Sequence, residues 1–204
     1  MTAFLYLTSM KIILTVYSLL LVVSAGAQTD VTLFDRHIDA QGAHIVEEFV
    51  SLLEIPNVAY DLPNINKNAQ YIIGELTDRG VSTQLLEHPG VPPIVYGYLA
   101  SKKATRTLAF YVHYDGQPVD KTRWKHDPWT PKMYDKSLAE GGVEIPFPKE
   151  GEKIDPVSRI YARSAGDDKG PIIGILAAID AMQAAGVEPT SNFVFFFEGQ
   201  EEAG

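Results

Sequence analysis

The sequence contains no cysteine among its 204 residues. This absence excludes disulfide bonds, a cysteine nucleophile and thiolate metal ligands. The sequence also has no run of lysine and arginine, and its formal net charge is −9. Since phosphate binding needs a clustered basic surface, we expect no nucleic acid partner. With 46% apolar residues, the chain is typical of a globular protein and not of a disordered one.

The start of the chain has the features of a signal peptide. Lys11 precedes the apolar residues 12–23, and the small residues 24–27 follow them. A basic start, an apolar stretch and a small-residue cleavage site predict a secretory signal over residues 1–27, cleaved after Ala27. The protein is then expected to be secreted or periplasmic, without stable membrane insertion. An uncleaved anchor is the alternative, although the run is short against the roughly 20 residues of a membrane span.

Helices and strands are predicted to alternate along the rest of the chain. Periodicity indicates helices over residues 35–53 and 171–185, and a third from the N-cap Asn66 to a stop at Gly80. Strands are predicted over residues 81–87, 94–100, 107–112 and 191–197. Because the last two are nearly continuous apolar runs, we expect an α/β fold with helices on both faces of a mainly parallel sheet. Residues 116–159 lack periodicity and are predicted to be a long functional or disordered loop.

Three polar clusters stand where a predicted strand ends or a helix begins. His113 and Asp115 follow one strand, Asp167 precedes a helix, and Glu201 and Glu202 follow the phenylalanine-rich strand. Each cluster alone is also typical of an ordinary structural feature without a catalytic role, namely a surface turn, a helix cap or a charged loop. Because ligands bind beyond the carboxyl ends of strands in α/β sheets, we expect the three clusters to form one site.

The residue types in these clusters suit a metal-dependent hydrolase. Residues i and i+2 of a strand point the same way, so Asp115 could orient a metal-binding His113. Asp167 could bind one metal ion or bridge two. Of two adjacent glutamates, one could bind metal while the other acts as a general base. A set of His, Asp and Glu ligands suits zinc, whereas carboxylates alone would suit magnesium or manganese better.

The three motifs resemble those of one zinc peptidase family. They are His113-Tyr114-Asp115, Ser164-Ala165-Gly166-Asp167-Asp168-Lys169-Gly170-Pro171 and Glu198-Gly199-Gln200-Glu201-Glu202-Ala203-Gly204. That family includes acetylornithine deacetylase, succinyl-diaminopimelate desuccinylase, aminoacylase, glutamate carboxypeptidase and carnosinase-type dipeptidases. Trp124 and Asp127-Pro128-Trp129 also resemble a family segment, and Asp-Asp-Lys-Gly-Pro looks most like the dipeptidase branch. The resemblance covers roughly residues 35–204.

The resemblance implies a layered α/β/α catalytic domain with two divalent ions, zinc first and manganese or cobalt as alternatives. By this resemblance His113 binds one ion, Asp167 bridges both and Glu202 binds the other. Glu201 is then the general base, and Asp115 orients His113. The implied substrate is a small peptide or an N-acyl amino acid.

The chain also departs from the family pattern. Ala162-Arg163-Ser164 stands where the family usually has Gly-Arg-Gly. The family's further Asp and His ligands, and its lid or dimerisation domain, would lie beyond Gly204. We therefore expect residues 28–204 to be the N-terminal part of a catalytic domain that is inactive alone and whose full-length form is a homodimer.

Two other functions are compatible with parts of the sequence. Residues 162–166 resemble the nucleophile elbow of a serine hydrolase, with Ser164 as the nucleophile. That fold needs its helix directly after the serine and a later histidine, and no histidine follows His126. The second alternative is an inactive binding module with the same fold as the metallopeptidase.

Overall fold

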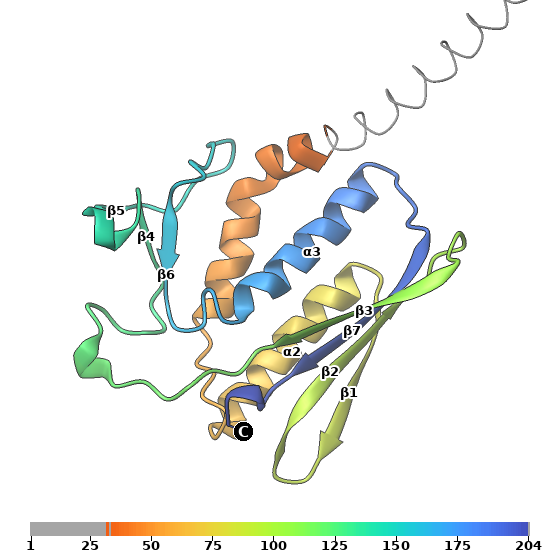
Figure 1. The fold of residues 1–204 in the computed structure, drawn as a ribbon, viewed down its shortest axis with the longest axis horizontal. Coiled ribbons are helices and arrows are strands. Elements are labelled where there is room, and N and C mark those ends of the chain that lie inside the picture. Colours follow the sequence, from red (N-terminus) through yellow and green to blue (C-terminus); the bar gives the residue numbers. More distant parts are fainter. Residues whose placement is uncertain (1–31, 33, 204) are drawn as a thin grey trace, which may run out of the picture.

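The computed structural model describes residues 32 and 34–203 (Figure 1). The predicted signal peptide, residues 1–27, lies outside the described residues. Within the described part of the chain, no helix is long and apolar enough to cross a membrane. The main sheet has the order β1-β2-β7-β3. Its strands are β1 (Ser82–His88), β2 (Val91–Leu99), β7 (Ser191–Glu198) and β3 (Arg106–His113).

The main sheet is mixed. Only β3 and β7 pair in parallel, with Val112 opposite Phe197 and His113 opposite Glu198. The pairs β1–β2 and β2–β7 are antiparallel. The prediction of a mainly parallel sheet was therefore wrong, although the α/β class was right. The reason is local, because a tight turn at Gly90, with φ +77°, joins β1 directly to β2 and so forces an antiparallel hairpin.

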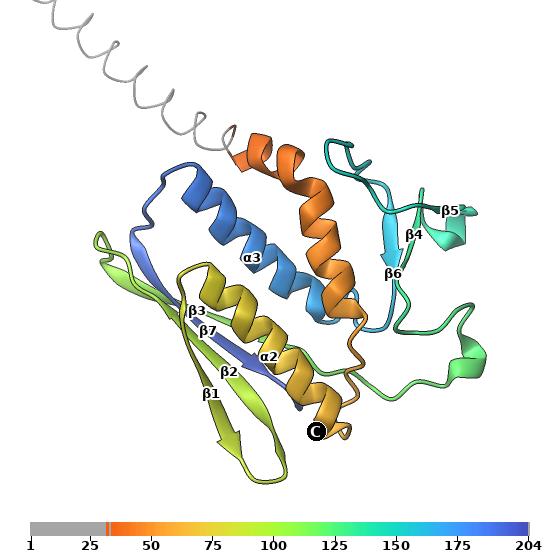
Figure 2. The same ribbon diagram turned by 180° about the vertical axis from the view of Figure 1, so that it is seen from behind.

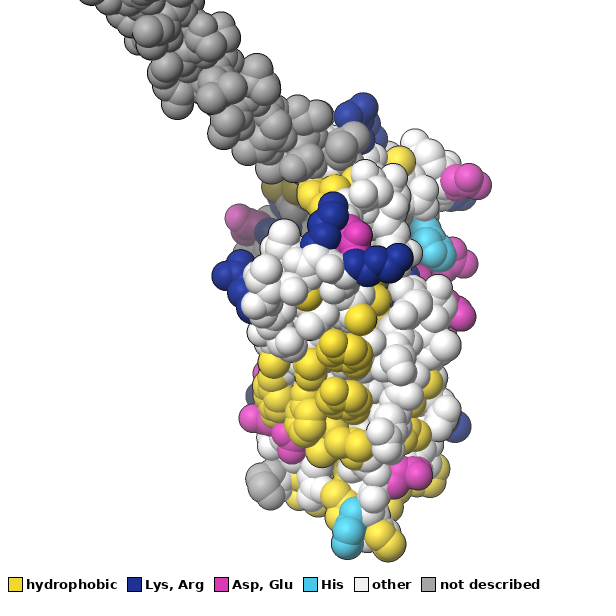
Figure 3. Space-filling model, turned by 90° about the vertical axis from the view of Figure 1, so that its right-hand side faces the viewer, with side chains coloured by type: hydrophobic (Ala, Val, Ile, Leu, Met, Phe, Trp, Pro, Cys, Tyr) yellow, Lys and Arg dark blue, Asp and Glu magenta, His cyan; other side chains and the backbone are white. Residues whose placement is uncertain are grey.

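Three helices pack on one face of this sheet. They span residues 34–53, α2 (Leu62–Asp78) and α3 (Lys169–Ala184) (Figures 1 and 2). Their apolar side chains meet Phe193, Phe195 and Phe197 of β7 in one core. The other face is open among the described residues, and the exposed side chains there include Tyr98 and Tyr111, so apolar atoms gather on it (Figure 3). The expectation of helices on both faces was wrong for the part of the chain that the structure describes.

The second helix begins earlier than predicted. Asp61, and not Asn66, is its N-cap, and its carboxylate accepts hydrogen bonds from the backbone and side-chain amides of Asn64. Pro63 lies in the first turn, where proline is favoured because no intrahelical N–H partner is lost. Asn66 is exposed in the second turn. The Asp-Leu-Pro sequence is a stronger start signal than the lone asparagine.

Residues 116–159 are not a featureless loop. A second sheet has the order β5-β4-β6 and is formed by β4 (Lys132–Tyr134), β5 (Glu144–Ile145) and β6 (Arg159–Tyr161). Short 3-10 helices cover Lys121–Arg123 and Leu138–Glu140, and a third covers Glu201–Ala203 after β7. Tyr134 is buried and packs edge-on against Tyr161. This sheet leads the chain into the segment that carries Asp167.

Candidate metal-binding active site

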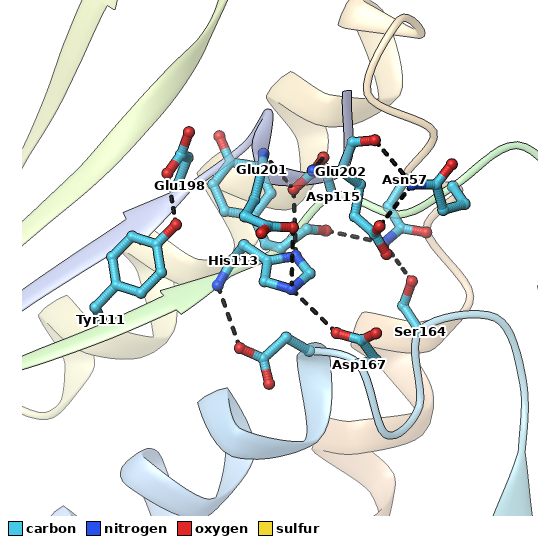
Figure 4. A network of polar contacts seen from close by, with 12 residues as sticks. Asn57, Tyr111, His113, Asp115, Ser164, Asp167, Glu198, Glu201 and Glu202 are labelled. Atoms are coloured by element: carbon cyan, nitrogen blue, oxygen red, sulfur yellow. Dashed lines mark hydrogen bonds and ion pairs between the residues drawn. The ribbon is translucent and has the colours of Figure 1, made fainter. Parts of the chain in front are cut away.

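The three predicted clusters meet at one edge of the main sheet. Since β3 and β7 are parallel neighbours, their carboxyl ends place His113 and Glu198 side by side. The N-terminal end of α3 lies at the same edge. Asp167 and Asp168, which directly precede this helix, are therefore brought to His113 (Figure 4). The sheet register and the helix start therefore assemble a site from three segments that are distant in the sequence.

His113 lies at the centre of this cluster. Its ring is buried, and Nε2 lies 3.1 Å from Asp167 Oδ1 and 3.9 Å from Glu201 Oε2. Nδ1 lies 3.3 Å from Asp115 Oδ1, although the two atoms lack the alignment of a hydrogen bond. Nε2 thus faces Asp167, a predicted metal ligand, and Glu201, the predicted general base, while Nδ1 faces the carboxylate that was predicted to orient the ring.

Asp115 joins the histidine to the glutamate loop. Its side chain is fully buried and accepts hydrogen bonds from the backbone N–H groups of Glu201, at 3.1 Å, and Glu202, at 2.9 Å. Burial raises the pKa of Asp115, while these N–H groups and His113 oppose the rise. Asp115 therefore holds the loop of both glutamates in addition to facing His113, a second role that the sequence did not indicate.

The two glutamates point in different directions. Glu201 is half exposed and reaches toward His113 Nε2. Glu202 accepts a hydrogen bond of 2.7 Å from Gln117 Nε2, and its other oxygen lies 3.9 Å from Arg163 Nη2. Glu202 and Asp167 line the same pocket of about 210 Å³, together with Trp124 and Arg163. Glu201 is thus the nearer of the two to His113.

Asp168 occupies the N-cap position of α3 without capping it. Its side chain makes no hydrogen bond to the helix. Instead, Oδ2 accepts a long hydrogen bond of 3.4 Å from the backbone N–H of His113. The peptide bond between Asp167 and Asp168 is cis. The alternative interpretation of this pair as a helix cap is therefore not supported, because both carboxylates turn toward His113.

The carboxylates around His113 set its protonation. Burial alone would lower the pKa of His113, but the negative charges of Asp115, Asp168, Glu201 and Asp167 raise it overall. A ring that attracts a proton in this way lies in a field that favours any cation. The site is therefore electrostatically suited to a divalent metal ion.

The distances within the site fit metal ligation in part. When two side chains bind one tetrahedral zinc ion at about 2.0–2.2 Å, their ligand atoms lie about 3.4 Å apart. The distance from His113 Nε2 to Asp167 Oδ1 is 3.1 Å, close to this value. Within residues 32 and 34–203, however, no group of three or more His, Cys, Asp or Glu side chains is close enough to hold a metal ion. The described residues thus supply a ligand pair with its orienting carboxylate.

Sequence patterns did not indicate two buried polar residues near the site. Asn57 is fully buried, and its side-chain amide donates to Tyr114 O and to Ser164 Oγ. Lys169 is also fully buried, and Nζ donates to Leu52 O at 2.7 Å and to a second carbonyl in the same segment at 2.8 Å. Burial places the pKa of Lys169 well below its usual value. Both residues connect the site with the end of the helix at residues 34–53 and the loop that follows it. Such long-range contacts leave no signal in the local sequence.

Ser164 lacks the surroundings of a serine nucleophile. It is buried, and its hydroxyl accepts a hydrogen bond of 2.9 Å from Asn57. Among the described residues, no histidine forms a hydrogen bond with it. Helix α3 begins only at Lys169, so the strand–turn–helix geometry of a nucleophile elbow is absent here. The structure therefore gives no support to the serine hydrolase alternative.

Comparison with known proteins identifies the family. Residues 109–204 match the model of peptidase family M20/M25/M40. The chain contains part of a peptidase domain of this family. The matched residues include all three motifs from which the zinc peptidase family was predicted, and that prediction is confirmed.

The chain resembles M20 dipeptidases over a limited part of their length. The Cys-Gly metallodipeptidase DUG1 of Candida albicans is 32% identical over 188 residues, which are 84% of this chain and 34% of that protein. The Beta-Ala-His dipeptidase of Homo sapiens is 30% identical over 114 residues, which are 56% of this chain and 18% of that protein. The chain thus spans about a third or less of these curated relatives.

A solved structure supports the fold. The dipeptidase Dug1p of Saccharomyces cerevisiae matches this chain with a TM-score of 0.66 and 23% sequence identity. The match covers 85% of this chain and 35% of that chain. At this identity the likeness establishes a shared fold and not the substrate.

Proposed function

We propose that this protein is a metal-dependent hydrolase that cleaves the amide bond of a dipeptide or a small N-acyl amino acid. The observation that carries this proposal is the geometry around His113, whose two ring nitrogens face Asp167 and Asp115. That pairing of a ligand with an orienting carboxylate is typical of metal sites in enzymes. The named relatives, a Cys-Gly and a Beta-Ala-His dipeptidase, support the dipeptide as the substrate class.

The proposed cofactor is a pair of divalent ions, with zinc preferred and manganese or cobalt as alternatives. His113, Asp167 and Glu202 would hold them, with Asp167 shared between the two. When bound, such ions polarise a carbonyl group and lower the pKa of water from about 15.7 to near 7. Asp115, behind His113, would keep the ring in the tautomer that leaves Nε2 free.

Glu201 is the proposed general base. Its carboxylate is half exposed and lies 3.9 Å from His113 Nε2, so it can reach a water molecule at the site. It would take a proton from the attacking water as the new carbon–oxygen bond forms. It would then give that proton to the leaving nitrogen as the carbon–nitrogen bond breaks. The backbone N–H of Glu201 is held by Asp115, which fixes the base relative to His113.

Metal uptake and hydrolysis test this proposal together. We expect zinc bound by the purified chain to be lost in His113→Ala and retained in the control His88→Ala. His88 lies at the tip of the β1–β2 hairpin, and among the described residues its ring makes a hydrogen bond only with Pro89 O. In a form of the protein that has the family's complete ligand set, hydrolysis of Cys-Gly or β-Ala-His should disappear with a chelator and return with zinc. Equal zinc uptake by the His113→Ala variant would rule out the proposed site.

The proposed setting of this activity is outside the cytoplasm. It rests on the signal-like residues 1–27, and the resemblance to the family adds a homodimer as the proposed assembly. N-terminal sequencing of the exported protein should give Gln28 as the first residue. An exported protein that retains Lys11 would show that the segment is not cleaved as proposed.

A further inference from the structure

Asn57 connects the segments that carry the site. It follows Pro56 in the loop after the helix at residues 34–53, and its side chain is fully buried. Both N–H donors of its amide are used, one on Tyr114 O and one on Ser164 Oγ, each at 2.9 Å (Figure 4). Its backbone carbonyl accepts from Gly116 N at 2.8 Å. One residue therefore contacts two separate loops of the candidate site.

These contacts lie immediately beside the candidate ligands. Tyr114 stands between His113 and Asp115 in the chain, and Ser164 stands three residues before Asp167. The Asn57 amide thus spans the gap between the loop that carries the histidine and the turn that carries the proposed bridging carboxylate. A side chain that fixes this gap also fixes the distance between His113 Nε2 and Asp167 Oδ1, which is 3.1 Å.

The packing around Asn57 is tight. A Cβ atom on Gly116 would lie 2.4 Å from Ser164 Oγ and 3.1 Å from Asn57 Nδ2, so no larger residue fits there without displacement. Ser164 has φ +62°, a left-handed conformation that favours glycine. The hydrogen bond from Asn57 and one from Lys169 N to Ser164 O hold the serine in it. The turn before Asp167 is therefore set from outside by Asn57.

We propose that Asn57 is a positioning residue that sets the separation of His113 and Asp167 for metal binding. This inference rests on the proposed function, because it concerns the same site. Asn57 touches neither carboxylate nor imidazole, so it acts through the backbone of Tyr114 and the hydroxyl of Ser164. Asparagine suits the position because it supplies two donors to two acceptors.

Asn68 provides a matched control for a purely structural role. It is also a fully buried asparagine, and its amide also donates twice, to Pro56 O at 2.9 Å and Asn64 O at 2.8 Å. It supports the same loop from the side of α2 and contacts neither site segment. Asn57→Ala and Asn68→Ala should therefore lower the melting temperature to a similar degree.

The test compares zinc affinity in Asn57→Ala, the isosteric Asn57→Asp and Asn68→Ala by competition with a chromophoric chelator. Supporting groups around metal ligands change affinity by about 10–100-fold when they are lost. We expect both Asn57 variants to bind zinc at least about tenfold more weakly, with Asn68→Ala within about threefold of the wild type. Equal zinc affinities in Asn57→Ala and Asn68→Ala would overturn the inference.

A second measurement separates this inference from the proposed function. The ¹⁵N signals of the His113 imidazole, recorded without metal, should shift in Asn57→Asp and stay unchanged in Asn68→Ala. If the wild type binds no zinc, the proposed function fails, and these signals alone decide the role of Asn57. Unchanged His113 signals in Asn57→Asp would refute it.

Discussion

The Arg79 side chain ties three helices together, and its removal is the sharpest test of the packing described above. Its guanidinium donates to Glu48 Oε1 and Glu75 Oε2 at 2.6 Å each, and to Asp180 Oδ2 at 2.8 Å. These carboxylates belong to the first described helix, α2 and α3, respectively. His44 Nε2 lies 3.4 Å from the same Glu48 oxygen. Three carboxylates therefore share one buried arginine.

The substitution Arg79→Met should cost about 4 kcal/mol of unfolding free energy at neutral pH. The side chains of Arg79 and Glu48 are 7% and 9% exposed, and removing one partner of a buried ion pair costs about 3–5 kcal/mol. Glu75 and Asp180 are 21% and 28% exposed, so they add at most about 1 kcal/mol each. Among the described residues Glu48 Oε2 has no hydrogen-bond partner, so the loss of Arg79 leaves only His44, 3.4 Å from Oε1, beside this carboxylate.

The cost of Arg79→Met should depend on pH. Burial raises the pKa of Glu48, and the hydrogen bond and charge of Arg79 oppose that rise. Without Arg79 the pKa rises further. A carboxyl group whose folded pKa is raised contributes stability below its unfolded pKa and loses that contribution as pH rises through the folded value. The destabilisation should therefore be larger at pH 7.5 than at a lower pH at which Glu48 is protonated.

Chemical denaturation at both pH values measures this prediction. Arg159→Met is the control, because within the described part of the chain Arg159 donates only to nearby backbone carbonyls, and it should change stability by no more than about 0.5 kcal/mol. The double variant Glu48→Gln/Arg79→Met should lose the pH dependence. A loss below about 1 kcal/mol in Arg79→Met, the value typical of exposed ion pairs, would refute the reasoning, and so would a cost that grows as pH falls.

Two further outcomes follow from the geometry. Gly116→Ala should destabilise the protein by about 1–3 kcal/mol in chemical denaturation, since its Cβ would lie 2.4 Å from Ser164 Oγ. The control Gly74→Ala, in a helix with nothing within 4 Å, should stabilise it, and a stabilising Gly116→Ala would contradict the packing. The hydrogen bond from Tyr111 to Glu198 raises the pKa of Tyr111 to about 12. In a ¹³C NMR titration the phenol should therefore stay protonated until the pH approaches that value. Glu198→Gln should lower that pKa toward 10, the ordinary tyrosine value, and an unchanged midpoint would exclude the contact.

Local sequence signals predicted the elements of the fold better than their arrangement. The predicted strand over residues 107–112 and helix over residues 171–185 fall within two residues of β3 and α3. The prediction that helices cover both faces of the sheet was wrong, because a continuous apolar run does not show whether a strand is buried on both faces or on one. In β7, Phe195 is fully buried under the helices, whereas Phe196 points to the open face and stacks on Tyr111. Large aromatic residues on the open face thus make β7 resemble a strand that helices cover on both faces.

The candidate site was predictable where its residues stand at the ends of elements. His113 ends β3 and Asp167 precedes α3, and both positions follow from local pattern alone. Asn57 was not predictable, because its partner Ser164 is 107 positions away and an asparagine after a helix is an ordinary loop residue. The network around Arg79 escaped prediction for the same reason, since Asp180 is 101 positions away in sequence.

The two buried polar residues Asp115 and Asn57 each hold a different pair of site segments together. Asp115 joins the histidine to the glutamate loop through two backbone N–H groups, and Asn57 joins the same histidine loop to the turn before Asp167. The strands alone bring His113 opposite Glu198, which is three residues short of Glu201. The sheet register does not extend beyond Glu198, so it cannot position Glu201. The hydrogen bonds of Asp115 to the loop after β7 must therefore position that glutamate. Substitutions at these two positions should therefore disturb the site more than equally costly substitutions in the core of the sheet.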